Sequence, residues 1–228
     1  MDGFESCQSG GAAMNIVLFG GTGNIGQRIA LEAANRGHNV VAVVRDPARS
    51  QVPDSRVRLV RGDATDAASV ASVARGADAV VSAISPRPGT TGSAPSLVDA
   101  ARGLIAGLKQ AGVKRLLVVG GAGSLEVAPG VMLMDAPGFP EAYRGEAVEG
   151  RDALAVYRAE ADELDWTYLS PAAEIQAGER TQRYRTTLDQ FLTDEQGRSH
   201  ISYEDYAVAL VDELERSQHV GRRFGVAY

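Results

Sequence analysis

Short runs of β-branched and apolar residues alternate with longer amphipathic stretches through the first half of the chain. Strands are expected at residues 15–19, 40–44, 57–60, 79–84 and 115–119. Helices are expected between them at residues 24–36, 67–75 and 96–110. Because such alternation is typical of a parallel sheet covered on both faces, the pattern predicts a doubly wound α/β fold of the Rossmann type.

The pattern changes after residue 120, where residues 120–140 combine glycine, proline and methionine without a sustained period. A loop of this length inside a compact domain is uncommon and is often functional. The sequence before the last helix, residues 172–200, is polar and rich in arginine, and we expect a short hairpin or excursion there. Regular elements are expected as a helix at 141–164, a strand at 166–169, a helix at 202–216 and an edge strand at 224–228.

We expect a single domain over residues 14–228, with elements on the substrate side at about 121–145 and 172–200. Residues 1–13 are polar and acidic and lack the basic start and apolar stretch of a signal peptide. They are interpreted as a disordered extension or a cloning remnant, with Met14 as the natural start. The expected location is the cytoplasm.

Composition narrows the class of protein. The net charge of −6 disfavours a nucleic-acid-binding face, and the longest apolar run is far shorter than the roughly 20 residues that span a bilayer. Cys7 is the single cysteine, and His38, His200 and His219 show no metal-ligand spacing. We therefore expect no nucleic acid, no membrane and no metal. The sequence leaves the oligomeric state open.

A glycine-rich turn lies between the first expected strand and the first expected helix. In the pattern G-x-x-G-x-x-G, the first glycine permits a tight turn, the second lets the backbone approach a pyrophosphate, and the third allows close packing. The pyrophosphate would then lie on the positive end of the helix. The alternative is a glycine turn without a ligand. The residues expected to bind the dinucleotide here are Gly20, Thr22, Gly23, Asn24, Ile25 and Gly26.

Arginines follow the second expected strand. An acidic residue at this point accepts hydrogen bonds from the ribose of NAD, whereas arginine suits the 2′-phosphate of NADP. Arg45 directly follows the strand, and Arg49 could reach the same phosphate. The sequence therefore favours NADP(H) over NAD(H). In the alternative, Arg45 stacks on the adenine or is solvated, and Asp46 takes the ribose.

Further cofactor contacts are expected where the later strands end. Asp63 could accept from the adenine amino group with the Ala64 N–H donating to the ring, or Asp63 could serve only as a turn or helix-capping residue. Strand ends at the carboxyl edge are where open α/β sheets bind ligands. The residues expected near the nicotinamide end are Ser82, Ala83, Ile84 and Pro171.

Most of residues 14–224 resembles the atypical short-chain dehydrogenase/reductases with an NAD(P)H-binding, NmrA-like core. The resemblance is greatest to the NADH-flavin reductase group, which is related to the biliverdin-IXβ (flavin) reductases. It implies a pyridine nucleotide-dependent reductase and makes flavin the first substrate class to test. The passages that carry it are the glycine turn and residues 115–125, 164–173, 178–181 and 201–206.

The proton-relay chemistry of the typical short-chain dehydrogenases is missing. Those enzymes use a Tyr-x-x-x-Lys pair, in which the lysine lowers the pKa of the tyrosine. This chain has only Lys109 and Lys114, and the residues four positions after Tyr143 and Tyr157 are alanines. Alcohol oxidation or sugar-nucleotide epimerisation through such a pair is therefore disfavoured. A flavin or quinone-like acceptor needs only hydride and a proton from solvent.

Catalytic candidates remain few. The related biliverdin/flavin reductases carry a serine after the fifth strand and a histidine after the sixth. In this chain the serine position is displaced to the region of Ser124, and Ala173 stands in place of the histidine. Ser124 and Tyr143 are the catalytic candidates, although Ser124 could equally be a loop-capping residue. Possible walls of the acceptor site, or simply core and lid packing, are Met132, Met134, Phe139, Tyr143, Arg180 and Tyr184; Arg180 could instead pair with Glu179 at the surface.

Two functions are consistent with these features. The first is an NAD(P)H-dependent reductase that passes hydride to a small flavin or quinone-like acceptor. The alternative is a non-catalytic, NmrA-like regulator that senses NADP, which the missing Tyr–Lys pair fits equally well. The compact length favours the enzyme. An isomerase or dehydratase is weaker because acid–base residues are lacking.

Overall fold

A central sheet of eight strands organises the chain. The computed structural model describes residues 12–51, 54–85 and 96–228, so the expected extension at residues 1–13 lies mostly outside the described residues. The strand order is β10-β12-β8-β5-β4-β1-β2-β3. Neighbouring strands are parallel except for β10, which runs antiparallel to β12. The strands are β1 (Asn15–Phe19), β2 (Asn39–Val44), β3 (Val57–Arg61), β4 (Ala79–Ser82), β5 (Arg115–Val119), β8 (Asp165–Ser170), β10 (Arg185–Thr187) and β12 (Arg222–Ala227).

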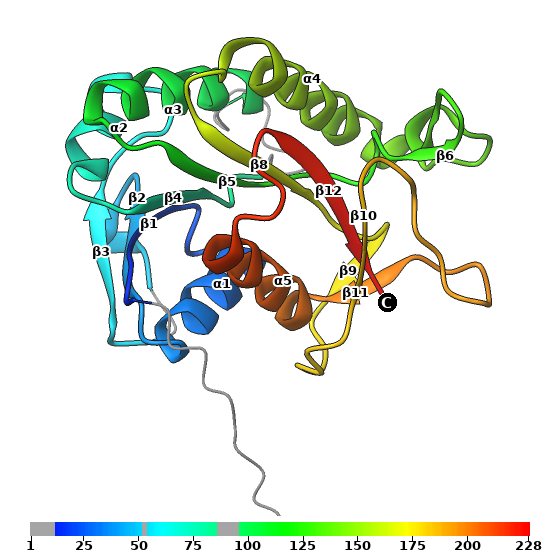
Figure 1. The fold of residues 1–228 in the computed structure, drawn as a ribbon, viewed down its shortest axis with the longest axis horizontal. Coiled ribbons are helices and arrows are strands. Elements are labelled where there is room, and N and C mark those ends of the chain that lie inside the picture. Colours follow the sequence, from blue (N-terminus) through cyan, green and yellow to red (C-terminus); the bar gives the residue numbers. More distant parts are fainter. Residues whose placement is uncertain (1–11, 52–53, 86–95) are drawn as a thin grey trace, which may run out of the picture.

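Helices cover both faces of this sheet (Figure 1). On one face lie α1 (Asn24–Asn35) and α5 (Tyr203–Arg216). On the other face lie α2 (Ala67–Ala74), α3 (Leu97–Ala111) and α4 (Arg144–Glu160). Each helical layer packs its apolar residues against one side of the sheet and forms its own buried cluster. The predicted Rossmann-type α/β fold is therefore confirmed.

Two expectations about the second half were wrong. The edge strand expected at 224–228 is β12, which lies between β8 and β10, so that the excursion provides the edge. The helix expected at 141–164 is shorter, because Glu141–Tyr143 form a 3-10 turn and α4 ends at Glu160. Ala161 follows as its cap and packs fully buried beneath the helix end.

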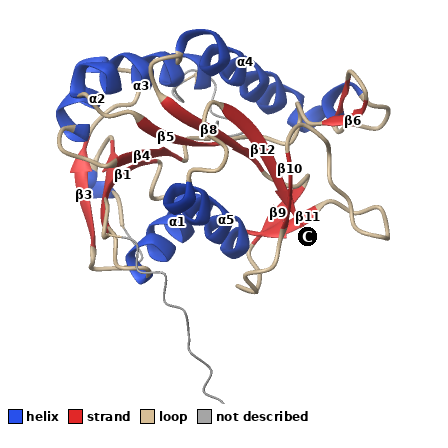
Figure 2. Cartoon of the chain, in the orientation of Figure 1, coloured by secondary structure: helices blue, strands red, loops and turns tan. Residues whose placement is uncertain are grey.

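The two segments expected on the substrate side form small structures of their own (Figure 2). Strands β6 (Glu126–Ala128) and β7 (Val131–Met132) make a hairpin after β5, followed by a 3-10 turn at Leu133–Asp135. Strands β9 (Glu174–Gln176) and β11 (His200–Ser202) pair in parallel within the later excursion. Among the described helices, none combines the length and apolar character needed to cross a bilayer.

One edge of the sheet collects the starts of the helices. Because α1, α3 and α4 each connect two parallel strands, they all begin at the edge where the strands end. Open α/β sheets bind their ligands at this carboxyl edge, where the strand order reverses. Here the reversal falls between β1 and β4.

Candidate functional site

The glycine turn after β1 is held against the end of β4. Gly20 has a φ of +78°, and a Cβ atom at this residue would lie 2.4 Å from the carbonyl oxygen of Ala83. A Cβ atom at Gly26 would lie 2.2 Å from the carbonyl oxygen of Gly20. Both distances exclude a side chain, so these glycines are required by the packing of the turn itself.

Gly23 differs from its two neighbours in the motif. It is exposed and caps α1, and a Cβ atom there would meet only the carbonyl oxygen of Gly20, at an ordinary 3.5 Å. Packing therefore does not require a glycine at this position. A side chain would, however, stand over the first turn of α1 and hinder the approach of a ligand.

The start of α1 has the properties of an anion site. In the described part of the chain, no side chain caps the helix and its first turn holds no acidic residue. Side chains cap α2, α3 and α5, at Asp66, Ser96 and Ser202, whereas α4 also lacks a side-chain cap but carries Glu146 in its first turn. Asn24 and Ile25 follow Gly23, and the carbonyl of Thr22 accepts from the Gln27 side chain at 2.9 Å. The N–H groups of this first turn and the helix dipole together favour a phosphate.

Arginines gather where β2 and β3 end. Arg45 and Arg49 are exposed, on either side of a 3-10 turn that Asp46 caps by accepting from the Ala48 N–H at 3.1 Å. Arg61 is also exposed and ends β3, in register with the last residue of β2. Sequence reasoning missed Arg61, although its position at the end of β3 parallels that of Arg45 after β2.

The expected adenine contacts lie in a tight turn after β3. One carboxylate oxygen of Asp63 accepts from the N–H of Thr65 at 2.9 Å and from its hydroxyl at 2.8 Å. Ala64 is buried, and a Cβ atom at Gly103 of α3 would lie 2.2 Å from its carbonyl oxygen. The structure thus gives Asp63 a role in the turn, while its contact with adenine stays a prediction.

The residues expected near the nicotinamide come together beside the glycine turn. The N–H of Ala83 donates to the carbonyl of Phe19 at 2.8 Å, which extends the pairing of β4 with β1. Ser82 is buried, and Ile84 follows at the strand exit. Pro171 is buried at the end of β8, two strands away in the sheet. These positions lie at the carboxyl edge after β4 and β8, with the end of β5 between them.

The two catalytic candidates have different surroundings. Tyr143 is 60% exposed and precedes α4. Ser124 is buried, and both its hydroxyl and its carbonyl accept from the Arg223 guanidinium, at 2.9 and 2.8 Å. Arg223, only 5% exposed, also pairs with Asp189 of the excursion. Ser124 therefore helps to join three segments of the chain, and its catalytic role stays a prediction.

Two of the six possible wall residues belong elsewhere. Arg180 forms two 2.8 Å hydrogen bonds with the Glu32 carboxylate on α1. The Tyr184 hydroxyl donates to Asp212 on α5 at 2.5 Å. Both side chains thus serve the α1–α5 face, and Arg180 pairs with Glu32 rather than with Glu179.

The other four wall residues remain near the start of α4. Met134 is buried, and its N–H donates to the carbonyl of Gly123 at 2.9 Å. Met132 and Phe139 are half-buried in the same loop, and Tyr143 follows it. These residues keep their interpretation as walls, lid or packing of the acceptor side.

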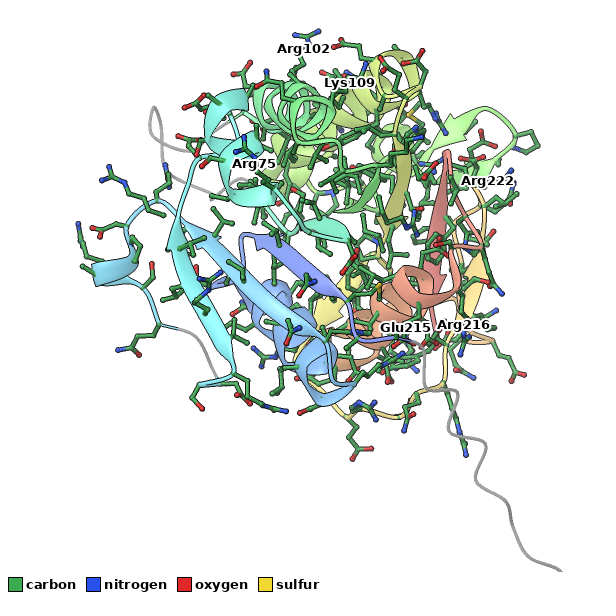
Figure 3. All side chains as sticks on the ribbon, turned by 60° about the vertical axis from the view of Figure 1, so that its left-hand side comes forward. Arg75, Arg102, Lys109, Glu215, Arg216 and Arg222 are labelled. Carbon is green, nitrogen blue, oxygen red and sulfur yellow. The ribbon has the colours of Figure 1, made fainter. Side chains whose placement is uncertain are left out.

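Two other kinds of active group, a catalytic lysine and a metal centre, have no counterpart in the described ranges 12–51, 54–85 and 96–228. Lys109 lies near the carboxyl end of α3, where it pairs with Glu163 at 2.8 Å. Figure 3 shows it near Arg102 on the α3–α4 layer. In these ranges, no three His, Cys, Asp or Glu side chains are grouped so that they could hold a metal ion.

Comparison with known proteins supports this interpretation of the glycine turn. Residues 20–217 match the model of a family described as NAD(P)H-binding. The chain is 41% identical to the "Uncharacterized protein YwnB" of Bacillus subtilis (strain 168), over 93% of this chain and 98% of that protein.

Solved structures agree with the sequence comparison. One is named "Putative exported protein" from Burkholderia pseudomallei, with 47% identity, a TM-score of 0.85 and coverage of 94% of this chain and 100% of that one. Another, from Streptococcus pneumoniae, is named "a putative NADH-flavin reductase"; it has 34% identity, a TM-score of 0.80 and coverage of 94% and 99%.

Proposed function

The chain belongs to the NAD(P)H-binding family, and from this premise we propose that it is an NADP(H)-dependent reductase. Its acceptor is a small flavin or quinone-like molecule, and it works without a Tyr–Lys pair. The observation that carries the proposal is the start of α1 behind Gly23, which has no side-chain cap and no acidic residue in its first turn and follows the glycine turn at the carboxyl edge of the sheet.

The chain's own residues would hold the dinucleotide along the carboxyl edge. The first turn of α1 would bind the pyrophosphate through its N–H groups. Ala83 and Ile84, beside the glycine turn, would support the nicotinamide ribose, and Asp63 with Ala64 would meet the adenine. When bound, the cofactor supplies a hydride, and the protein contributes chiefly the relative position of cofactor and acceptor.

The preference for NADP(H) rests on the arginines after β2. Arg45 and Arg49 offer planar guanidinium groups, which bind phosphates in a bidentate manner. Arg61 adds a third positive charge at the neighbouring strand end. Asp46, the acidic residue of this turn, already accepts one hydrogen bond from the backbone. The local charge is therefore suited to a 2′-phosphate.

Replacement of Arg45 tests the cofactor preference. A charge-assisted hydrogen bond contributes about 1.5–3 kcal/mol, so Arg45→Asp should lower kcat/KM for NADPH by roughly 10- to 100-fold. The value for NADH should change by less than about 3-fold, because NADH lacks the phosphate. Arg75→Asp is the matched control, since Arg75 is exposed and caps the opposite end of its helix, α2. Equal losses for NADPH and NADH would contradict the preference.

An acceptor panel tests the reaction itself. The loss of NADPH absorbance is followed with FMN, FAD, riboflavin and simple quinones, while cofactor affinity is measured separately by calorimetry. A reductase consumes NADPH with at least one acceptor. A non-catalytic regulator, which the position of Lys109 far from the carboxyl edge also allows, binds NADP⁺ and NADPH but leaves the absorbance unchanged.

A further inference from the structure

An arginine of α1 reaches back to the first turn of its own helix. Arg28 follows Asn24 by four residues, and helical side chains lean towards the amino end of the helix, so its side chain lies over the first turn. The Nη1 atom of Arg28 donates to the carbonyl of Asn24 at 3.4 Å. Asn24 directly follows Gly23, in the turn assigned above to the pyrophosphate. This contact brings the Arg28 guanidinium to the proposed cofactor site.

Two residues at the start of α5 hold the same guanidinium. The Nε atom of Arg28 donates to the Glu204 carboxylate at 3.1 Å, and its Cζ atom lies 5.6 Å from the centre of the Tyr203 ring. At this distance a cation is attracted to the face of an aromatic ring. The Arg28 side chain is 30% exposed. A side chain held in this way is in position before a ligand arrives, which reduces the entropic cost of a contact.

The charge of Arg28 adds to the positive potential of the helix end. The amino end of a helix carries a partial positive charge, which stabilises anions and disfavours cations. No acidic residue lies in the first turn of α1. The next acid along the helix, Glu32, pairs with Arg36 and Arg180. A cation next to the first turn therefore strengthens the attraction for an anionic ligand.

One carboxylate balances this cation. Within residues 12–51, 54–85 and 96–228, the carboxylate that pairs with Arg28 is that of Glu204 alone. Burial raises the pKa of Glu204, but hydrogen bonds from the Gly178 N–H and from Arg28 outweigh it and leave the pKa below 4.5. Glu204 is therefore ionised at neutral pH. The two side-chain charges cancel, and the N–H groups of the first turn leave the site positive.

The side of α1 that faces α5 is the nicotinamide side of the proposed binding mode. Figure 1 shows α5 next to α1, in the direction of β8 and β12. The carboxyl edge runs from the glycine turn after β1, past β4 and β5, to Pro171 after β8. Because Arg28 meets the first residues of α5, it lies on the side of the glycine turn that leads towards Pro171.

We propose that Arg28 binds the pyrophosphate of the dinucleotide from the nicotinamide side. This inference rests on the proposed function, because it assumes that the cofactor lies along the carboxyl edge. The guanidinium keeps its Nε contact with Glu204 and donates from its terminal nitrogens to phosphate oxygens, in the planar geometry that phosphates accept. NADPH and NADH both carry the pyrophosphate. Arg28 therefore contributes to the affinity for either cofactor, unlike Arg45.

Arg28→Ala tests this contact. Because hydrogen bonds between charged groups are among the stronger ones, the Kd values for NADPH and NADH, measured by calorimetry, should both rise by about 10-fold. The Kd for ADP-ribose, which contains the pyrophosphate, should rise as well. Adenosine 2′-monophosphate lacks the pyrophosphate. Its affinity should be unchanged in Arg28→Ala and reduced in Arg45→Asp.

Arg36→Ala is the matched control. Arg36 also joins α1 to α5, through a 2.7 Å contact with Asp212, but it caps the opposite end of the helix. Its replacement should lower Tm and leave the Kd values for both cofactors unchanged. An equal rise in Kd in Arg36→Ala would show that Arg28 acts only by joining the two helices, and would overturn the proposal.

Glu204→Gln separates a ligand contact from a bridge between helices. Glutamine keeps an oxygen for the Gly178 N–H but removes the negative charge beside Arg28. If Arg28 binds the pyrophosphate, the Kd for NADPH in this variant should equal the wild-type value or fall below it, because the site becomes more positive. A rise in Kd as large as that in Arg28→Ala would contradict the proposal.

The wild-type protein offers a readout that does not depend on the folding of Arg28→Ala. The NMR resonance of the Arg28 Nε–H group, assigned with Arg28→Lys, should shift when ADP-ribose is added and stay in place with adenosine 2′-monophosphate. No shift with ADP-ribose would overturn the proposal. If the wild type binds NADPH and Arg28→Ala binds it equally well, only the role of Arg28 fails. If the wild type binds neither NADPH nor NADH, the proposed function itself fails.

Discussion

Gly26→Ala tests whether the geometry of the glycine turn determines NADPH affinity independently of the overall stability of the protein. A Cβ atom at this position would lie 2.2 Å from the carbonyl oxygen of Gly20, whereas real Cβ contacts are essentially never below 3.0 Å. Gly26→Ala must therefore open the turn by about 1 Å. Overpacking of this kind typically destabilises a protein by about 1–3 kcal/mol.

The same displacement acts on the cofactor. In the proposed binding mode the turn supplies the N–H groups for the pyrophosphate, and hydrogen bonds weaken steeply once their geometry is lost. We expect the Kd for NADPH to rise at least about 10-fold, which corresponds to about 1.4 kcal/mol. For a chain of this size, the stability loss should lower Tm by roughly 2–12 °C.

Gly107→Ala is the matched control. Its Cβ atom would lie 2.4 Å from the Val70 side chain, between α2 and α3 and away from the glycine turn. It should lower Tm by a similar amount and leave NADPH affinity unchanged. Calorimetric titration well below both melting temperatures gives the Kd values. Wild-type affinity in Gly26→Ala, or an equal loss in Gly107→Ala, would refute the reasoning.

Two further substitutions test the ionic contacts of the α5 face. Arg180→Ala removes a partner of the buried Glu32. Because Arg180 is 42% exposed, the free energy of unfolding measured in urea should fall by only about 1 kcal/mol. A changed KM for the acceptor would instead support Arg180 as a wall of the acceptor site. Burial raises the pKa of Glu213, but hydrogen bonds from His219 and the charge of Arg115 outweigh it and leave the pKa below 4.5. Since a depressed pKa stabilises the folded state above the unfolded-state value, this stabilisation should be lost as the pH falls below about 4.5. Urea midpoints between pH 3 and 6 should therefore vary less in Glu213→Gln than in wild type, and identical pH dependence would contradict the assignment.

Local features made the first half of the fold predictable. The glycine turn could be predicted because the atoms that exclude a side chain at Gly20 and Gly26 belong to residues a few positions away or on the adjacent strand. The start of α5 is equally local, since the Ser202 hydroxyl accepts from the Asp205 N–H at 2.9 Å, a capping contact within one helical turn. Signals of this kind lie within one turn of the chain and can be recognised in the sequence.

Predictions for the second half failed where a residue or strand has a partner far away in the sequence. Arg180 was a candidate wall of the acceptor site because nothing nearby in sequence shows that Glu32, 148 residues earlier, is its partner. The sequence predicts β12 as an edge strand because its outer partner, β10, lies in an irregular excursion that shows no strand pattern.

The two ends of the binding edge are held by different kinds of contact. At the cofactor end, glycines bring backbone against backbone, as between Gly20 and Ala83, and a single added methyl group is excluded. At the proposed acceptor end, the buried Arg223 holds Ser124 on one side and Asp189 on the other. An ionic anchor of this kind fixes where two loops meet while leaving the residues beyond it free to vary. The proposed cofactor end is therefore constrained chiefly by close backbone contacts, and we expect differences in acceptor among related chains to arise from the hairpin and the excursion that Arg223 joins.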